Sequence, residues 1–415
     1  MNKTELTNLA EQKLAQSVMP FLEFNQKHLD LFKQKGLLSM PESYPFTNLE
    51  TFFEKVTSIS HKTTYRDSTK DSDSEFIHLT ISEEGPTFVN HQINGLKVSK
   101  MTQAEIEFLQ NNGQLSPLTH LHHALLKNGV VVEIAKNTII EKPIKINYQS
   151  ETSKLFAKIL FIRLGANSKA TLMDESRHLH DKIALMHETY IEVGAGANLE
   201  HIQIHQNDEH TINHLTNDAS VSKDGNYRNI IINLSGKLNR CNLNLRLTEP
   251  GARGESFNLY LTNDFEHSDI NTVIHHLAAD TTSQQIAKGI LNGDSKGIFT
   301  GKIHIHPHAQ RVVSGQLNKN LILSKKAQAH SMPQLEIFAD DVKCSHGSTT
   351  GELSDEEIFY FEARGIPKDE AKTILANGFG LEIVHKIENK TLRKKIESVV
   401  LDQLNIKFKL GAQHE

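Results

Sequence analysis

The chain has 415 residues, enough for two or three domains and a large buried core. Its formal net charge of -5, with acidic and basic residues interspersed, gives no electrostatic case for nucleic-acid binding. Two cysteines, Cys241 and Cys344, exclude a disulfide framework, and the sequence has neither a signal-peptide pattern nor an apolar run of about 18 residues. We therefore expect a cytoplasmic protein with no membrane partner.

Residues 1–128 are predicted to form a helical and mixed domain. Apolar residues at helical spacing mark its first part, and a polar stretch poor in apolar residues follows. The predicted elements are a helix over 3–35 broken near Met19-Pro20, a short helix at 49–56, a mobile loop at 57–74, strands at 76–81 and 87–93, and a short helix at 101–111.

Residues 129–353 keep a strand pattern for more than 200 residues. Late in this region the strands begin near Phe257, Ile270, Gln284 and Ile298, a spacing of about 13 or 14 residues. The turn motif Gly-Ala-Asn also recurs, at 165–167 and 196–198. A sandwich and a solenoid both fit short regular strands, but the length and the absence of intervening helices favour a parallel β-helix. End coils of such a solenoid have an uncovered inner face, so we expect a partner at one end.

Residues 354–415 are predicted to form a C-terminal helical domain. Ser354 and Glu357 fit a capping box that opens a helix through Ala363, and Gly365 follows as its stop. The remaining predicted elements are a helix from Pro367 closed at 378–380 and a longer helix at 381–404.

Cys344 and His346 are the leading candidates for chemistry. In an extended run they lie on one face, because side chains of a strand repeat every second residue. A thiolate and an imidazole two residues apart on one strand face could share a soft metal ion or exchange a proton. Spacing alone favours the simpler explanation, a small buried cysteine and a surface histidine.

Other histidines are abundant and individually carry little information. His304, His306 and His308 alternate and could offer three nitrogens to zinc or iron, but Pro307 bends the last one away, and an exposed polar face explains them better. The same explanation applies to four histidines of mixed spacing, His201, His205, His210 and His214. Gly194 and Gly196 could begin a dinucleotide-binding fingerprint, but Leu199 stands where it needs a third glycine. No Walker A or G-x-S-x-G motif occurs in the sequence.

The stretch from Gln310 to Gly380 resembles the SufB/SufD family of the SUF iron–sulfur cluster assembly machinery. The resemblance lies in QLNKNLILS, PQLEIFADDVKCSHGST, FYFEARGI and EAKTILANGF, with weaker similarity in NGVVVEIAKNTIIEKPI and VGAGANLEHIQIHQ. The low cysteine count and the Lys343-Cys344-Ser345-His346 run favour the SufD branch over SufB. The segment ESYPFTNL at 42–49 departs from the family, since it lacks the tryptophan of the N-terminal signature.

This resemblance implies a right-handed parallel β-helix flanked by N-terminal and C-terminal helices, and a subunit that is not itself an enzyme. It implies a complex with SufB, joined through β-helix strands, and with the SufC ATPase. It also implies a transient iron–sulfur cluster at the SufB interface, held with the help of His346 and with Cys344 nearby. We expect the SufC-binding residues to be Ser354, Phe359, Tyr360, Arg364, Gly365 and Phe379.

Two other functions remain as alternatives. A structural adaptor would stabilise SufB and SufC without binding iron. A β-helix carbohydrate-active enzyme would use acids such as Asp340, Asp341 and Glu352, but these lack a basic residue at matching strand positions. The sequence leaves open whether a reduced flavin binds the complex and whether the isolated chain forms a homodimer.

Overall fold

The computed structural model describes most of the chain. The described residues are 3–14, 21–35, 47, 74–82, 85–89, 93–111, 116–149, 155–178 and 184–411. The predicted short helix at 49–56 lies outside them, as does the predicted loop at 57–74 apart from Ser74, which is exposed in a turn.

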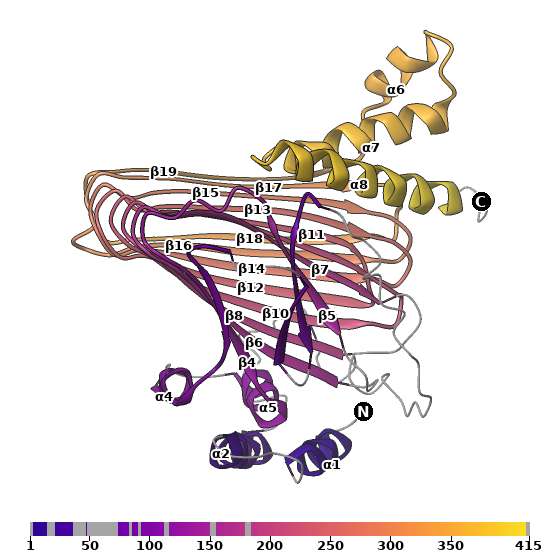
Figure 1. Ribbon diagram of the computed structural model, residues 1–415. Helices are drawn as coiled ribbons and strands as arrows, with labels where there is room; N and C mark the ends of the chain where they lie inside the picture. The colour runs from indigo at the N-terminus through magenta and orange to yellow at the C-terminus, as the bar shows by residue number, and fades with distance from the viewer. Residues whose placement is uncertain are drawn as a thin grey trace.

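Two stacked sheets form a parallel β-solenoid, in which the chain alternates between the sheets (Figure 1). This confirms the predicted β-helix. The ten-stranded sheet contains β1 (Ile77–Ser82), β2 (Gly85–Val89), β5 (Ile144–Gln149), β7 (Lys169–His178), β9 (Asn198–Asn207), β11 (Asn226–Ser235), β13 (Arg253–Thr262), β15 (Thr282–Leu291), β17 (Val312–Ile322) and β19 (Val342–Gly351). The nine-stranded sheet contains β3 (Leu96–Lys100), β4 (Gly129–Ile134), β6 (Leu155–Leu164), β8 (Ala184–Val193), β10 (Ile212–Val221), β12 (Leu238–Leu247), β14 (His267–His276), β16 (Lys296–Ile305) and β18 (Gln328–Ile337).

The alternation between sheets explains the strand spacing in the sequence. Ile212 of β10 pairs with Ala184 of β8 on one side and with Leu238 of β12 on the other. One coil therefore takes two strands and two turns, which gives a new strand at about half the coil length. The sheets also include β1 to β3, so the β architecture begins ahead of residue 129.

One corner of the solenoid repeats a left-handed residue in successive coils. Asn137, Asn167, Gly196 and Asp224 all have positive φ, and each of the first three donates its backbone N–H to the next coil. Such a φ favours glycine, asparagine and aspartate over other residues. Asn167 is thus the structural equivalent of Gly196. The two Gly-Ala-Asn motifs of the sequence are therefore out of register and do not mark equivalent positions.

The interior of the solenoid is apolar along one half of the strands and polar along the other. In β9, Leu199 belongs to the apolar half. His201, Gln203 and His205 lie on the same inward face of this strand and are buried and polar. Gln203 joins the two sheets, because its Oε1 accepts hydrogen bonds from Asn217 of β10 at 2.6 Å and from Asn229 of β11 at 3.2 Å. Buried amides of this kind are stable only when they are hydrogen-bonded.

The N-terminal helices cover the outer face of the nine-stranded sheet. They are α1 (Lys3–Leu14), α2 (Phe21–Lys35), α4 (Gln103–Asn111) and α5 (Pro117–Leu125). The predicted helix at 3–35 forms two helices, α1 ending at Leu14 and α2 beginning at Phe21, and the predicted break near Met19-Pro20 lies outside the described residues. Helix α5 was not predicted, although Ser116 is a standard N-cap that accepts a hydrogen bond from Thr119 N, and Pro117 follows it.

A buried carboxylate anchors α5 to the sheet. Glu188 of β8 lies 2.8 Å from Nε2 of His123 and 3.1 Å from Nδ1 of His122. Burial by itself raises the pKa of Glu188, but the two imidazoles outweigh it and the pKa lies well below its ordinary value.

The C-terminal helices α7 (Lys368–Val384) and α8 (Lys390–Gly411) cover the outer face of the ten-stranded sheet, and α6 (Asp355–Glu362) precedes them. Apolar residues at helical spacing in 381–404 predict a core or partner-docking face, and in the structure this stripe packs on the sheet through Ile387, Ile396, Val400 and Leu404. The predicted stop at 378–380 is wrong, because α7 continues to Val384. Gly380 packs against the sheet inside the helix, and the helix is interrupted only at 385–389.

Ser354 lies at the N-cap of α6 but makes no side-chain capping hydrogen bond, so the predicted capping box does not form. Within the described part of the chain, no helix is both long and apolar enough to cross a membrane.

Burial of neutral histidines makes the solenoid sensitive to acid. Burial lowers the pKa of His201 and of His205 to about 4, below the ordinary 6.5. In the unfolded chain these imidazoles take up protons first as the pH falls. Their stabilising contribution is therefore complete above pH 6.5 and is lost progressively down to about pH 4.

We expect the free energy of unfolding to be lower at pH 5.5 than at pH 7.5, with about 1 kcal/mol of the difference from each of these two histidines. The measurement is urea-induced unfolding at both pH values. His205→Gln removes one titrating group and should reduce the difference between the two pH values. An unchanged difference in the variant would show that His205 does not contribute.

Candidate functional site

The last coil of the solenoid has an uncovered inner face. β18 and β19 stand at the ends of their sheets, so each pairs with a strand on one side only among the described residues. In the sequence Leu335, Ile337 and Ala339 alternate with Glu336 and Phe338, a period that predicts a strand with one buried face. The structure corrects this: only Ala339 is fully buried, Leu335 is half-buried and Ile337 is 39% exposed. The reason is that no further coil stacks on them.

Cys344 and His346 are neighbours on the inner side of β19. Cys344 pairs in register with Ser314 of β17, and His346 pairs with Gln316. Ser314 and Gln316 are both buried inward residues, so the two β19 side chains continue their columns onto the open end of the coil. The predicted placement of Cys344 and His346 on one face is therefore confirmed.

These columns are polar for two coils below the open end. Ser314 Oγ lies 2.6 Å from Ser283 Oγ, and Gln316 Nε2 donates to Gln285 Oε1 at 2.8 Å. Cys344 and His346 thus continue two hydrogen-bonded columns that run inside the solenoid. A metal or sulfur species bound there would lie over a polar floor.

Cys344 and His346 differ in their exposure. Cys344 is half-buried and outside any disulfide, and burial raises the pKa of its thiol above the ordinary 9.0, while a backbone hydrogen bond from Ser314 opposes this. His346 is exposed. In this chain alone the thiol is therefore protonated at neutral pH, and a positive charge brought close to it would favour the thiolate.

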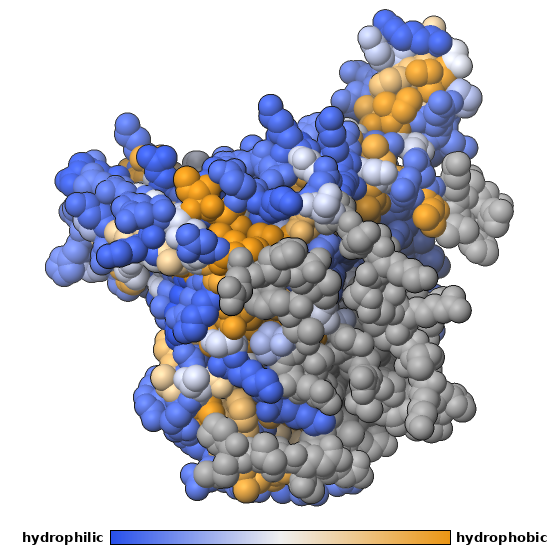
Figure 2. All heavy atoms as spheres, viewed as in Figure 1, coloured by the Kyte–Doolittle hydropathy of each residue, from blue (hydrophilic) through white to orange (hydrophobic). Residues whose placement is uncertain are grey.

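A helical arm formed by α6 and the outer end of α7 rises above the solenoid (Figure 1) and carries a hydrophobic patch (Figure 2). Phe359 is 68% exposed and Tyr360 is 54% exposed, and Ile374 of α7 is also exposed. Exposed aromatic residues gathered on one projecting element are typical of a protein-binding surface.

The other residues of the predicted partner site have different surroundings. The Arg364 guanidinium stacks on the Tyr360 ring with its Cζ 3.5 Å from the ring centroid, and exposed Gly365 turns the chain at a φ of +83°. Ser354 is exposed at the start of α6. Phe379 lies apart from them: it is half-buried where α7 meets the solenoid, with Lys288 Nζ 4.2 Å from its ring centroid.

A comparison with family models identifies the chain's relationships. The model described as "SUF system FeS cluster assembly, SufBD core domain" matches residues 146–379, more than half of the chain. The chain belongs to the SufBD family. The matched segment contains Cys344, His346 and the aromatic residues of the arm.

Individual relatives agree with this SufBD membership. An iron–sulfur cluster assembly SufBD family protein of Mycobacterium leprae is 33% identical over 45% of this chain and 50% of its own length. A SufBD family protein of Synechocystis is 28% identical over 68% of this chain and 65% of its own length. The iron–sulfur cluster assembly protein SufD of Escherichia coli is 29% identical over 56% of this chain and 55% of its own length. The chain thus matches between half and two-thirds of each of these relatives.

The solenoid of this SufBD chain contains a buried ion pair that the sequence analysis missed. Lys158 Nζ of β6 lies 3.6 Å from Asp174 Oδ2 of β7, and Tyr148 Oη donates to the same oxygen at 2.7 Å. Burial lowers the pKa of Lys158 to about 7, although Asp174 raises it. In the sequence, only the alternation of inward and outward residues along β6 could have indicated that Lys158 points into the solenoid. The pair links the two sheets near the N-terminal end.

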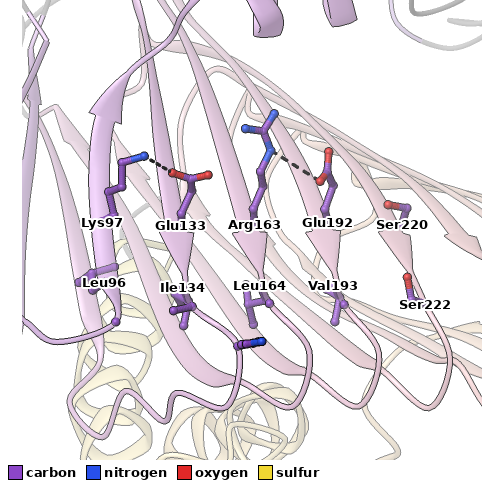
Figure 3. A pocket seen from close by; sticks show the side chains of 15 residues that line it. Leu96, Lys97, Glu133, Ile134, Arg163, Leu164, Glu192, Val193, Ser220 and Ser222 are labelled. Carbon is purple, nitrogen blue, oxygen red and sulfur yellow. Dashed lines mark hydrogen bonds and ion pairs between the residues drawn. The ribbon is translucent and has the colours of Figure 1, made fainter.

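A shallow groove crosses the outer face of the nine-stranded sheet at the same end (Figure 3). A row of register partners lines it, in which Lys97 pairs with Glu133 at 2.9 Å and Arg163 faces Glu192 at 3.6 Å. The four charges of this row compensate one another. Lys136 also lines the groove, and we assign the groove no role.

Thiol labelling tests the burial of the two cysteines. Burial raises the pKa of Cys241 to about 12 and hides it completely, whereas Cys344 is half-buried. We expect iodoacetamide to label one thiol in the native chain, slowly at pH 7 and faster as the pH rises toward 9, and two thiols after denaturation. Mass spectrometry measures the extent. Cys344→Ser should abolish native labelling; native labelling that persists in this variant would contradict the assignment.

Proposed function

We propose that this chain is a non-catalytic scaffold subunit of a cytoplasmic SUF complex, in which it holds part of a nascent iron–sulfur cluster against a SufB partner. The observation that carries the proposal is the pair Cys344 and His346, adjacent on the uncovered inner face of the last coil. The family membership supplies the chemical context.

The ligand count supports a site that is shared between two proteins. Iron–sulfur clusters are commonly held by four protein ligands. Cys344 and His346 provide two donor side chains, so a partner must complete the set. A site divided in this way can open when the two proteins separate, which suits a cluster that is assembled as cargo and then passed on.

The unpaired edges of β18 and β19 support the position of the partner. Exposed strand edges and uncovered apolar residues such as Ile337 and Phe338 favour pairing with another solenoid. SufB shares this architecture in the family resemblance, and its strands would extend both sheets. When SufB is absent, the same end can pair with a second copy of this chain.

The helical arm supports a second partner, the SufC ATPase. Phe359 and Tyr360 are large, exposed side chains of α6. ATP-driven movement of SufC would pull on α7, which packs on β13 and β15 of the ten-stranded sheet. The coupling needs two arrangements of the SufB interface, of which SufC favours one.

A structural adaptor that binds no iron is the alternative function.

Replacement of His346 distinguishes the scaffold from the adaptor. The chain is co-expressed anaerobically with SufB and SufC, and iron and acid-labile sulfide are measured per purified complex. We expect His346→Ala to lower both severalfold with unchanged subunit ratios. The control is Ser345→Ala, which alters the exposed neighbour on the opposite face of β19. Equal iron and sulfide in His346→Ala and wild type would favour the adaptor.

Replacement of Phe359 tests the arm. We expect Phe359→Ser to weaken SufC binding by about tenfold or more, since aromatic anchors dominate many interfaces. Binding is measured by titration of SufC into the purified chain. Ile406→Ser removes an apolar side chain on α8 that is also 52% exposed and serves as the matched control. Equal losses in both variants would argue against a specific site on the arm.

A further inference from the structure

Three histidines from two coils meet on the outer face of the nine-stranded sheet. His275 of β14 and His304 of β16 are register partners, and His306 follows β16 two residues after His304. One side-chain nitrogen from each lies within 4.8 Å of the other two. This cluster differs from the set that the sequence suggested, because His308 lies beyond the strand end and is exposed in the following turn.

The three imidazoles lie close together. Ring centroids are 5.3 Å apart for His275 and His304, 5.9 Å for His275 and His306, and 4.3 Å for His304 and His306. Zinc–nitrogen bonds of 2.0–2.1 Å place tetrahedral ligands about 3.3 Å from one another. Small side-chain rotations therefore suffice to bring three nitrogens onto one ion.

His306 supplies a nitrogen that the protein leaves unused. Its Nε2 is buried and has no hydrogen-bond partner among the described residues. A buried polar atom without a partner costs free energy, and a bound ion is one way to satisfy it. Since the ring itself is half-buried, the nitrogen remains close to the surface.

Glu336 orients a second imidazole. It is the register partner of His304 on β18, and its Oε2 lies 2.8 Å from His304 Nδ1. The hydrogen bond fixes the proton on Nδ1 and leaves the lone pair of Nε2 available. A carboxylate, a histidine and a metal ion in this order are a recurrent arrangement at zinc sites. Lys302 binds the other oxygen of Glu336 at 2.7 Å and helps hold it.

Burial favours the neutral form of His275. Burial, followed by the neighbouring His304 and His306, lowers the pKa of His275 to about 4. Neutral rings keep their lone pairs at pH 7. Two cations lie near the cluster: Arg246, the register partner of His275, is bound by Asp218, and Lys302 is bound by Glu336.

We propose that His275, His304 and His306 form a binding site for a divalent transition-metal ion of borderline softness, such as zinc, with Glu336 orienting His304. Three histidines and an open fourth position are a recognised zinc-binding set. The site lies on the outer face of the nine-stranded sheet, whereas Cys344 and His346 belong to the inner side of the other sheet. It is independent of the cluster-assembly proposal.

The test is titration of the purified full-length chain with Zn²⁺ in competition with a chromophoric chelator. We expect one site per chain that excess Mg²⁺ does not displace, because magnesium prefers oxygen ligands. His304→Ala and His306→Ala should each weaken binding at least about 100-fold, and Glu336→Gln by about 10- to 100-fold. Cobalt substitution should give visible absorption bands of a four- or five-coordinate ion.

His308→Ala is the matched control, because this exposed histidine lies next in the alternation but outside the cluster. It should bind Zn²⁺ as wild type does. Circular dichroism and the thermal midpoint without metal confirm that each variant is folded. Wild type without such a site, or folded His304→Ala and His306→Ala variants that bind as tightly as wild type, would overturn the proposal. So would an equal loss in His308→Ala.

Discussion

Stacking of each coil on the next is the constraint on which the rest of this structure depends. A coil buries its inward side chains only when a neighbour covers them, and its backbone groups pair only with strands above and below. Inside the solenoid this condition is met coil after coil. At the C-terminal end no further described coil follows, so the inward side chains of β18 and β19 remain uncovered. Cys344, a half-buried free thiol, lies there.

The polar half of the interior gives this end its chemical character. Hydrogen-bonded serines and glutamines run in columns beneath Cys344 and His346, and further in lie His201, His205 and the Lys158–Asp174 pair. A purely apolar interior would pack more simply. The polar columns cost desolvation and make the fold sensitive to acid, but they place donors and acceptors directly below the surface where a cluster would be assembled.

Register pairing on parallel strands builds both proposed metal sites, on different sides of the solenoid. Equivalent positions of successive coils lie side by side, so a residue type repeated at coil spacing becomes a cluster. On the outer face this brings His275 to His304 and Glu336. On the inner face it continues Ser314 and Gln316 into Cys344 and His346. The C-terminal helices differ in their packing: α7 and α8 cover the ten-stranded sheet, whereas α6 projects from it.

The sequence alone determined the fold class, because short strands at regular spacing without helices have few other solutions. It also placed Cys344 and His346 on one face, since the period of a strand is fixed by local geometry. Local patterns could not reveal the partners across coils. Asn167 aligns with Gly196 because hydrogen bonds, and not motif similarity, set the register. Pairing of β14 with β16 brings His304 and His306 to His275, whereas His308 lies beyond the strand end. Which inward residues stay exposed was decided by tertiary structure alone, because exposure depends on where the stack of coils ends.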